Sequence, residues 1–229
     1  MTEQQLHELQ SMLGHRFDDP ALLEAALTHS SYANENKKSG VASNERLEFL
    51  GDSVLGLTVA ELIYACFPDM PEGRMTKLRA ELVCEKSLAA LAMTFGLGAC
   101  ILLGRGEEKG GGRNRPSILA DAVEAVIAAM YLDGGFETVR RLINEHLFPL
   151  ADRIESESTD YKTVLQERIQ GKAGQTLSYQ VTDESGPDHM KSFSVEVLLN
   201  GVRVGCGAGK SKKEAEQTAA KSALEGMSP

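Results

Sequence analysis

Residues 44–52 have the sequence Asn44-Glu45-Arg46-Leu47-Glu48-Phe49-Leu50-Gly51-Asp52, in which three acidic residues interrupt an apolar helical pattern. A helix turns by about 100° per residue, so Glu45, Glu48 and Asp52 share roughly 60° of arc on one face. The sequence therefore predicts a helix over about 43–67 that carries a stripe of three carboxylates.

A second acidic pair repeats the spacing of three further along the chain. Asp121 and Glu124 lie in the apolar run 117–130, which contains no Lys or Arg. A carboxylate that is removed from water without a partner is costly. The pattern therefore indicates that a bound cation neutralises these acids.

Composition indicates a cytoplasmic protein without a membrane partner. The start of the chain lacks the basic and apolar segments of a signal peptide, and no uninterrupted apolar stretch approaches the roughly 18 residues that span a bilayer. The four cysteines include no Cys-x-x-Cys pair, which argues against a zinc site or a disulfide framework. We expect reduced and mostly buried thiols.

The net charge of −9 is unevenly distributed. Residues 160–229 hold nine Lys or Arg and nine Asp or Glu, so the whole excess of negative charge lies in residues 1–159. An acidic total counts against a nucleic-acid partner. Binding of a nucleic acid would therefore require local basic patches or neutralising metal ions.

Residues 1–152 have the pattern of an all-α domain. Asp19 is expected to cap a helix that begins with Pro20, and further helices are predicted at about 43–67, 76–95, 117–131 and 136–152. The glycine-rich segment 104–116 is predicted to be a loop with a flexible hinge at 110–112. Residues 153–159 are polar without a periodic apolar face, and we interpret them as a linker.

The sequence periodicity changes in residues 160–229. A helix at about 160–170 is followed by three alternating strands, at 177–181, 193–197 and 202–204, and by a helix at 212–225. The order α-β-β-β-α predicts a small α+β domain with one antiparallel sheet backed by two helices.

The last helix begins with a capping box formed by Ser211 and Glu214. Lys210, Lys212 and Lys213 surround this start, although cations oppose the helix dipole there. The arrangement indicates an external anion held by the helix start and the ammonium groups together. A solvated, charged helix end remains the alternative.

This part of the chain resembles double-stranded RNA binding domains in two segments, Lys212-Lys213-Glu214-Ala215-Glu216-Gln217-Thr218-Ala219-Ala220 and Gly186-Pro187-Asp188-His189. In that family the first helix and the β1–β2 loop contact minor grooves, and the lysines of the last helix contact phosphates. The resemblance implies a role in binding double-stranded RNA for Thr163, Gln166, Glu167, Gln170, His189, Lys210, Lys212 and Lys213. For His189, a hydrogen bond that stiffens its loop is the alternative.

The segment 45–55 resembles the signature of bacterial ribonuclease III, and the similarity extends through most of the chain. Supporting segments lie at 26–32, 72–80, 103–107 and 118–125. The resemblance implies that Glu48, Asp52, Asp121 and Glu124 form the catalytic metal cage. Glu45 and Glu72 would be auxiliary acids in the same valley near a subunit interface, although an acid in a first helical turn is also favoured by the helix dipole alone.

Hydrolysis of a phosphodiester needs an activated water and neutralisation of the charge that develops on phosphate, and two divalent ions can provide both. Carboxylates without His or Cys suit Mg²⁺, with Mn²⁺ as a substitute, better than zinc. The resemblance further implies a homodimer that cuts both strands of a duplex, leaves 5′-phosphate and 3′-hydroxyl ends with short 3′ overhangs, and processes ribosomal RNA precursors. Arg113 and Arg115 could then face the RNA, and His29 would be a hydrogen-bonding residue rather than a ligand.

Two other functions compete with this one. A non-catalytic double-stranded RNA binding regulator would have no need for six acids. An all-α nucleotide pyrophosphohydrolase also uses helical carboxylates and Mg²⁺, but a small nucleotide offers nothing for a domain that binds a long duplex. Metal-dependent cleavage of a long duplex separates these hypotheses.

Overall fold

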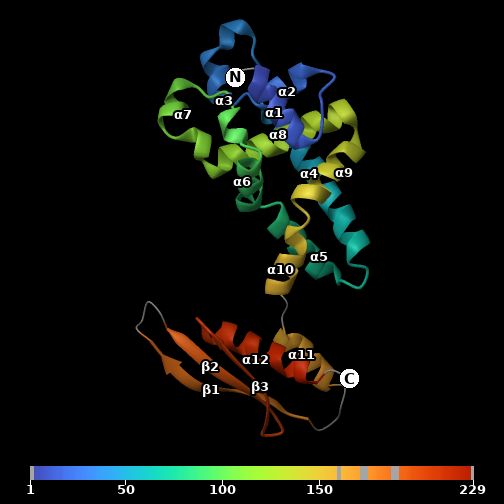
Figure 1. The fold of residues 1–229 in the computed structure, drawn as a ribbon, viewed down its shortest axis with the longest axis vertical. Coiled ribbons are helices and arrows are strands. Elements are labelled where there is room, and N and C mark those ends of the chain that lie inside the picture. The colour runs from blue at the N-terminus through green and yellow to red at the C-terminus, as the bar shows by residue number, and fades with distance from the viewer. Residues whose placement is uncertain (1–2, 159–160, 171–174, 187–190, 228–229) are drawn as a thin grey trace. The chain divides into compact units, whose positions relative to one another are not determined.

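The structure is a computed structural model that describes residues 3–158, 161–170, 175–186 and 191–227. The chain divides into two compact units, Met1–Glu157 and Ser158–Pro229. The first unit is helical, and the second is a three-stranded sheet with two helices on one of its faces (Figure 1). The fold class predicted from the sequence is confirmed.

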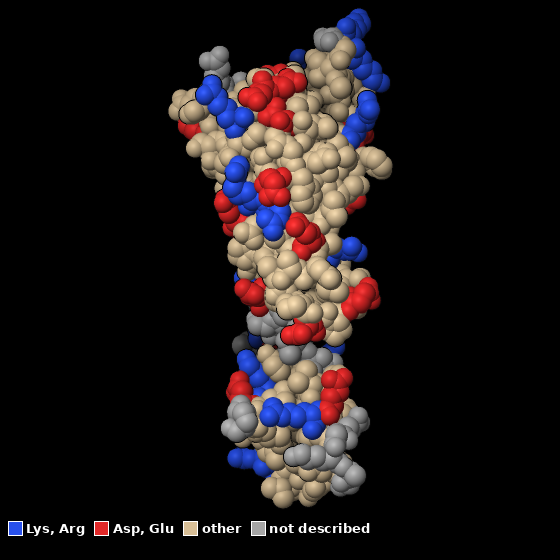
Figure 2. Space-filling view, turned by 90° about the vertical axis from the view of Figure 1, so that its right-hand side faces the viewer, with Lys and Arg blue, Asp and Glu red and all other residues tan. Residues whose placement is uncertain are grey.

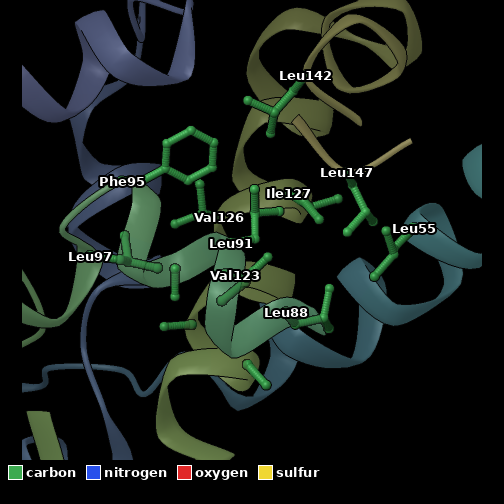
Figure 3. Packing of buried hydrophobic residues seen from close by; sticks show 14 of the residues in the cluster. Leu55, Leu88, Leu91, Phe95, Leu97, Val123, Val126, Ile127, Leu142 and Leu147 are labelled. Carbon is green, nitrogen blue, oxygen red and sulfur yellow. The ribbon is translucent and has the colours of Figure 1, made fainter. Parts of the chain in front are cut away.

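The helices of the first unit enclose one hydrophobic core. Side chains from α4, α6, α8 and α9 converge in it, among them Leu55, Leu91, Val126 and Leu142 (Figure 3). The α-helices are α1 Glu3–Leu13, α2 Pro20–Ala26, α3 Ser30–Glu35, α4 Glu45–Cys66, α5 Glu72–Leu82, α6 Glu85–Thr94, α7 Arg105–Lys109, α8 Pro116–Gly134, α9 Phe136–His146 and α10 Leu150–Ser158. Short 3₁₀ helices lie at η1 Lys37–Ser39, η2 Leu97–Ala99 and η3 Gly112–Asn114.

Helix α8 is surrounded by other helices along most of its length. Between positions 118 and 130 every residue is buried except Asp121 and Glu124. These two side chains therefore occupy the single stripe of this stretch that reaches the surface.

Helices α4 and α8 come into direct backbone contact where they cross. A Cβ atom built on Gly51 of α4 would overlap the backbone carbonyl of Glu124 on α8. Only glycine allows such a close approach. This crossing determines how near the acidic residues of the two helices come to each other.

Two helices predicted as single are each divided in the structure. The segment predicted as 76–95 forms α5 and α6, because Cys84 is extended and Ser87 Oγ donates a hydrogen bond to the carbonyl of Glu81 at 2.8 Å. Such side-chain bonds to the backbone compete with helix continuation. The segment predicted as 136–152 forms α9 and α10, and Pro149 lies at the break.

The predicted linker 153–159 is mostly helical. Helix α10 continues to Ser158, and Ile154 packs against the core of the first unit. Ile154 is the one apolar residue of this segment, and its packing beside Ala151 makes the first part of the segment a continuation of the first unit. The division between the two units falls between Glu157 and Ser158.

Helix α4 is long and apolar enough to cross a membrane by length and composition, with a mean hydropathy of 1.5 over its best window, of which 39% is buried in the protein. This differs from the expectation that no segment meets such a test. The core helix of a soluble protein passes the same test because it contacts apolar neighbours on several sides. The result is therefore weak evidence for a membrane span.

The cysteines differ from the expectation in their burial. All four are free, as expected, but only Cys100 is buried. Cys66, Cys84 and Cys206 are exposed. They lie at element ends or on strand faces that the core does not cover.

The second unit consists of α11 Tyr161–Gln170, strands β1 Leu177–Ser185, β2 Ser192–Leu199 and β3 Val202–Gly209, and α12 Lys212–Gly226. The strands form an antiparallel sheet in the order β1-β2-β3. Asn200 and Gly201 both have positive φ in the turn between β2 and β3, as a tight hairpin requires.

Helix α12 lies directly on β3 because both elements present small residues to each other. Cβ atoms on Gly205 or Gly207 would overlap the backbone of α12 at Ala219. Ala215, Ala219 and Ala223 are fully buried on the facing side of the helix. The start of α12, with its lysines, is therefore held firmly against the end of β3.

Candidate active site and RNA-binding surface

Four carboxylates gather where α4 and α8 cross. Glu48 and Asp52 lie on α4 on either side of Gly51, and Asp121 and Glu124 lie on α8. Glu48, Asp121 and Glu124 are half-buried, and Asp52 is exposed. The apolar run around Asp121 and Glu124 indicated that these two acids are removed from water, but the structure places them at the edge of the core, where an ion and a substrate can reach them.

The acids in this cluster act on one another electrostatically. Burial, together with the negative charges of Asp52, Asp121 and Glu48, raises the pKa of Glu124 to about 7. Burial also raises the pKa of Glu48, and Asp121 and Glu45 raise it further. These mutual effects require that the carboxylates from both helices lie close together.

Two further residues, His29 and Glu85, lie near Asp121. Burial raises the pKa of Asp121, His29 lowers it and Glu85 raises it. His29 caps the short helix α3, and its Nδ1 accepts a hydrogen bond from the Ser31 backbone at 3.2 Å. The prediction that His29 is a hydrogen-bonding residue is confirmed, whereas Glu85 was not recognised from the sequence because it lies outside the acidic motifs.

The chemistry of this cluster fits a hard divalent cation. In the described part of the chain, no three His, Cys, Asp or Glu side chains converge closely enough to enclose an ion by themselves. Like-charged carboxylates disfavour one another at short range, and Mg²⁺ keeps several of its waters and needs only a few direct carboxylate ligands. The carboxylates of α4 and α8 therefore form a site of concentrated negative charge that suits a hydrated divalent ion.

The two auxiliary acids lie in different places. Glu45, in the first turn of α4, accepts a hydrogen bond from Ser43 Oγ at 2.7 Å and lies near enough to raise the pKa of Glu48. Glu72 begins α5, accepts a hydrogen bond from Thr76 Oγ1 at 2.8 Å and lines a pocket with Tyr64. Within one chain, Glu72 therefore lies beside the C-terminal half of α4 rather than among the four carboxylates.

Helix α4 also has an exposed apolar stripe that the sequence reading missed. Phe49, Leu57 and Tyr64 are 79%, 61% and 75% exposed. Spacings of eight and seven residues place them on one side of the helix. The sequence contains a signal for this stripe, because apolar residues lie on more sides of the helix than packing against the core requires.

The lysines of the second unit surround the start of α12. Ser211 accepts a hydrogen bond from the Glu214 backbone, so the predicted N-cap is confirmed, and Glu214 in turn accepts from the backbone of Lys210 at 2.8 Å. Lys212 lies 3.7 Å from Glu184 and over the ring of Phe193. The Lys213 side chain is exposed.

Helix α11 presents the other predicted contacts. Thr163, Gln166 and Glu167 are exposed. Gln170 ends the helix, but its side chain and the whole of His189 lie outside the described residues. The relation of His189 to RNA therefore stays a prediction.

The glycine-rich segment is not a free hinge. It contains α7 and η3, and Arg113 donates hydrogen bonds to the carbonyls of Gly98 and Ile101 and pairs with Glu108 at 2.7 Å. Arg115 pairs with Glu107 at 2.5 Å. Both arginines therefore hold the segment together, so the prediction of a loop with a flexible hinge was wrong, whereas contact of Arg113 and Arg115 with RNA stays a prediction.

Charge on the visible face of the molecule is mixed. Figure 2 shows acidic and basic side chains scattered among large uncharged areas over the first unit, and side chains of both signs on the second. The carboxylate cluster is therefore distinguished by the proximity of its members rather than by the net charge of the unit.

Comparison with known families agrees with this division. The family model described as Ribonuclease-III-like matches residues 19–150. The model described as double-stranded RNA binding motif matches residues 161–227.

Individual relatives extend the similarity over the whole chain. Ribonuclease 3 of Pelotomaculum thermopropionicum is 52% identical over 218 residues, which are 94% of this chain and 90% of the relative. Ribonuclease 3 of Desulforamulus reducens is 50% identical over 230 residues, covering 98% and 94% of the two chains. The crystal structure of the nuclease domain of ribonuclease III from Campylobacter jejuni is 42% identical and covers 65% of this chain and 96% of that domain, with a TM-score of 0.59. With its carboxylate-bearing helical unit and its double-stranded RNA binding unit both matched, the chain belongs to the ribonuclease III family.

Proposed function

We propose that this protein is a Mg²⁺-dependent endoribonuclease specific for double-stranded RNA, with Mn²⁺ as a substitute ion. Residues 1–152 would provide the catalytic domain and residues 160–229 the duplex-binding domain. The observation that carries the proposal is the group of four carboxylates at the α4–α8 crossing, where Asp52, Asp121 and Glu48 raise the pKa of Glu124, in a chain that also contains a double-stranded RNA binding motif.

In this proposal Glu48, Asp52, Asp121 and Glu124 hold divalent metal, which supplies an activated water and neutralises charge on the phosphate when bound. Glu124 has a pKa of about 7 in the metal-free chain, so at neutral pH it exchanges its proton readily and can take up a cation in its place. The exposed carboxylate of Asp52 lies on the open side of the cluster, where a phosphate backbone would approach.

We also propose that two copies of the chain associate through α4. The apolar stripe of Phe49, Leu57 and Tyr64 runs along the same helix as Glu48 and Asp52 and is exposed in one chain. A related crystal structure of the Campylobacter jejuni nuclease domain, 43% identical, is described as flexible in a region involved in dimer formation. A two-fold axis would place one site on each strand of a duplex.

The same proposal assigns the products and the setting. Cleavage would leave 5′-phosphate and 3′-hydroxyl ends with short 3′ overhangs, in ribosomal RNA precursors and other structured RNAs of the cytoplasm. The free cysteines are compatible with a reducing compartment.

The test is incubation of the full chain with a long RNA duplex, the matching single strand, a DNA duplex and nucleoside triphosphates. We expect cleavage of the RNA duplex alone, dependent on Mg²⁺ or Mn²⁺ and abolished by a chelator, with ends identified by sequencing. Binding without cleavage at any Mg²⁺ concentration would instead support the regulator. Hydrolysis of the triphosphates would support the pyrophosphohydrolase.

A further inference from the structure

The start of α4 is fixed to another part of the chain by one buried amide. Asn44 is the residue before α4, and it is only 3% exposed. Its Nδ2 donates a hydrogen bond to the carbonyl of Ala26 at 3.3 Å, and its backbone N–H donates to the carbonyl of Thr28 at 2.8 Å. The residue therefore joins the start of α4 to the end of α2 through two bonds.

This use of an N-cap asparagine is unusual. Asn is favoured at this position because its side chain usually accepts a hydrogen bond from the first turn of its own helix. In Asn44 no such bond is formed, and the amide instead satisfies a carbonyl at the C-terminus of α2. The Asn44 side chain therefore does not stabilise the first turn of α4 and instead connects α4 with α2.

The segment that Asn44 holds continues toward the other half of the site. After Thr28 comes His29, which lies near enough to Asp121 to influence its carboxylate. The His29 backbone N–H donates to the carbonyl of Leu102 at 3.1 Å, which anchors the segment from its far side. Residues 26–29 therefore connect the start of α4 with the surroundings of Asp121 on α8.

This connection matters because the first turns of α4 contribute no buried residue to the core. The close approach of Gly51 to Glu124 fixes the distance between α4 and α8 at a single crossing point. Beyond the crossing, buried residues such as Leu55 and Val59 hold α4 in the core, whereas none of residues 45–50 is buried. Glu48 lies between this crossing and Asn44, and its backbone N–H makes the first helical bond to the Asn44 carbonyl at 2.9 Å.

We propose that Asn44 is a positioning residue for the carboxylate cluster, whose amide bond to Ala26 holds the first turns of α4, and with them Glu48, in place near Asp121. This inference rests on the proposed function. It assigns Asn44 no contact with RNA or with metal.

Two variants of the full chain separate this role from simple helix capping. Asn44→Ser keeps a favourable N-cap residue but is too short to reach the carbonyl of Ala26. Asn44→Asp keeps the shape of the side chain and replaces the donor by an acceptor. The matched control is Asn36→Asp, because Asn36 Nδ2 donates a similar bond to the carbonyl of Tyr32 at 2.9 Å, away from the carboxylates.

Electron paramagnetic resonance measures Mn²⁺ binding in the absence of RNA. Three further measurements are the Mg²⁺ concentration for half-maximal cleavage, the duplex affinity in chelator and the unfolding temperature. Both Asn44 variants should weaken Mn²⁺ binding and raise the Mg²⁺ requirement about tenfold, as misplacement of metal ligands commonly does. Duplex affinity should stay unchanged, and Asn36→Asp should bind Mn²⁺ like the wild type.

The inference is overturned if Asn44→Ser binds Mn²⁺ as tightly as the wild type, or if Asn36→Asp weakens binding equally. If Asn44→Asp does not fold, Asn44→Ser decides alone. A wild-type chain that binds no Mn²⁺ would overturn the proposed function itself, which is a different result from a change confined to the variants.

Discussion

The α4–α8 crossing and the start of α12 both collect charges of one sign, but they do so in opposite ways. At the crossing, Glu48, Asp121 and Glu124 are half-buried, and burial raises the pKa of all three, with further increases from neighbouring carboxylates. At the start of α12, the lysines are exposed, and Lys212 has Glu184 beside it.

This difference in burial indicates how each cluster binds its ligand. Half-buried carboxylates that repel one another oppose folding, and a cation bound among them removes that cost. Exposed lysines cost the fold little and gain their effect by releasing counterions from a nucleic acid. Cation binding at the first cluster should therefore be sensitive to the replacement of a single atom. RNA affinity at the second cluster should fall in proportion to the number of positive charges removed.

The largest effect is expected from removing one charge at the crossing. Glu124→Gln should lower the rate of duplex cleavage by about 10³-fold or more, because a ligand that neutralises transition-state charge is lost. Duplex affinity measured by gel shift should persist, because the second unit is unchanged. Glu137→Gln, on the exposed first turn of α9, is the control and should cleave normally. Retained cleavage in Glu124→Gln would remove this residue from the site.

The next effect tests the geometry of the crossing rather than its charge. Gly51→Ala introduces a methyl group that overlaps the carbonyl of Glu124, so α4 and α8 must separate. We expect a loss of about 3 kcal/mol in the free energy of unfolding and about 10²-fold in cleavage rate.

Gly106→Ala provides the control for this change, because no atom lies within 4 Å of a Cβ at that position of α7. Its stability and activity should remain close to those of the wild type. Equal behaviour of the two variants would show that the helices do not approach as closely as the structure indicates.

A third effect follows from the raised pKa of Glu124. Its folded pKa of about 7 exceeds the ordinary value of 4.5, so its contribution to stability is complete below pH 4.5 and is lost as pH rises through 7. Because Gln resembles the protonated acid, metal-free Glu124→Gln should match the wild type near pH 4.5 and exceed it by about 1 to 3 kcal/mol at pH 8.

Urea unfolding of both chains in chelator at several pH values measures this difference. With Mg²⁺ at pH 8 the wild type should instead be the more stable of the two chains, since only the wild type gains the full binding energy of the ion. A difference that does not vary with pH would mean that Glu124 lies in water, apart from the other acids.

The smallest effect concerns the lysines. Lys213→Ala should reduce the slope of log affinity against log salt by about one unit, as expected when one phosphate contact is lost. Lys212→Ala should have the same effect, because Glu184 beside it keeps its other partner, Lys191, at 3.1 Å. Lys221→Ala, two turns later on α12, is the control. An unchanged slope in both lysine variants would contradict a phosphate-binding role for this helix start.

The local features could be predicted from the sequence because they depend on neighbouring residues. The spacing of Asp121 and Glu124 identifies the only stripe of α8 that is not buried between positions 118 and 130. The caps at Asp19 and Ser211 and the order of the three strands also follow from short patterns. Each of these signals extends over one or two turns of helix or one strand, where periodicity alone decides which side faces the core.

Tertiary structure decided the features that depend on distant contacts. The break before α6, the ion pairs of Arg113 and Arg115, the packing of Ile154 and the separation of Glu72 from the other acids each involve partners that periodicity does not reveal. The acidic motifs themselves were in the sequence, but their meeting depends on Gly51 lying against Glu124. Sequence patterns determine which face of a helix is charged, whereas the distance between two such faces depends on how closely the backbones pack.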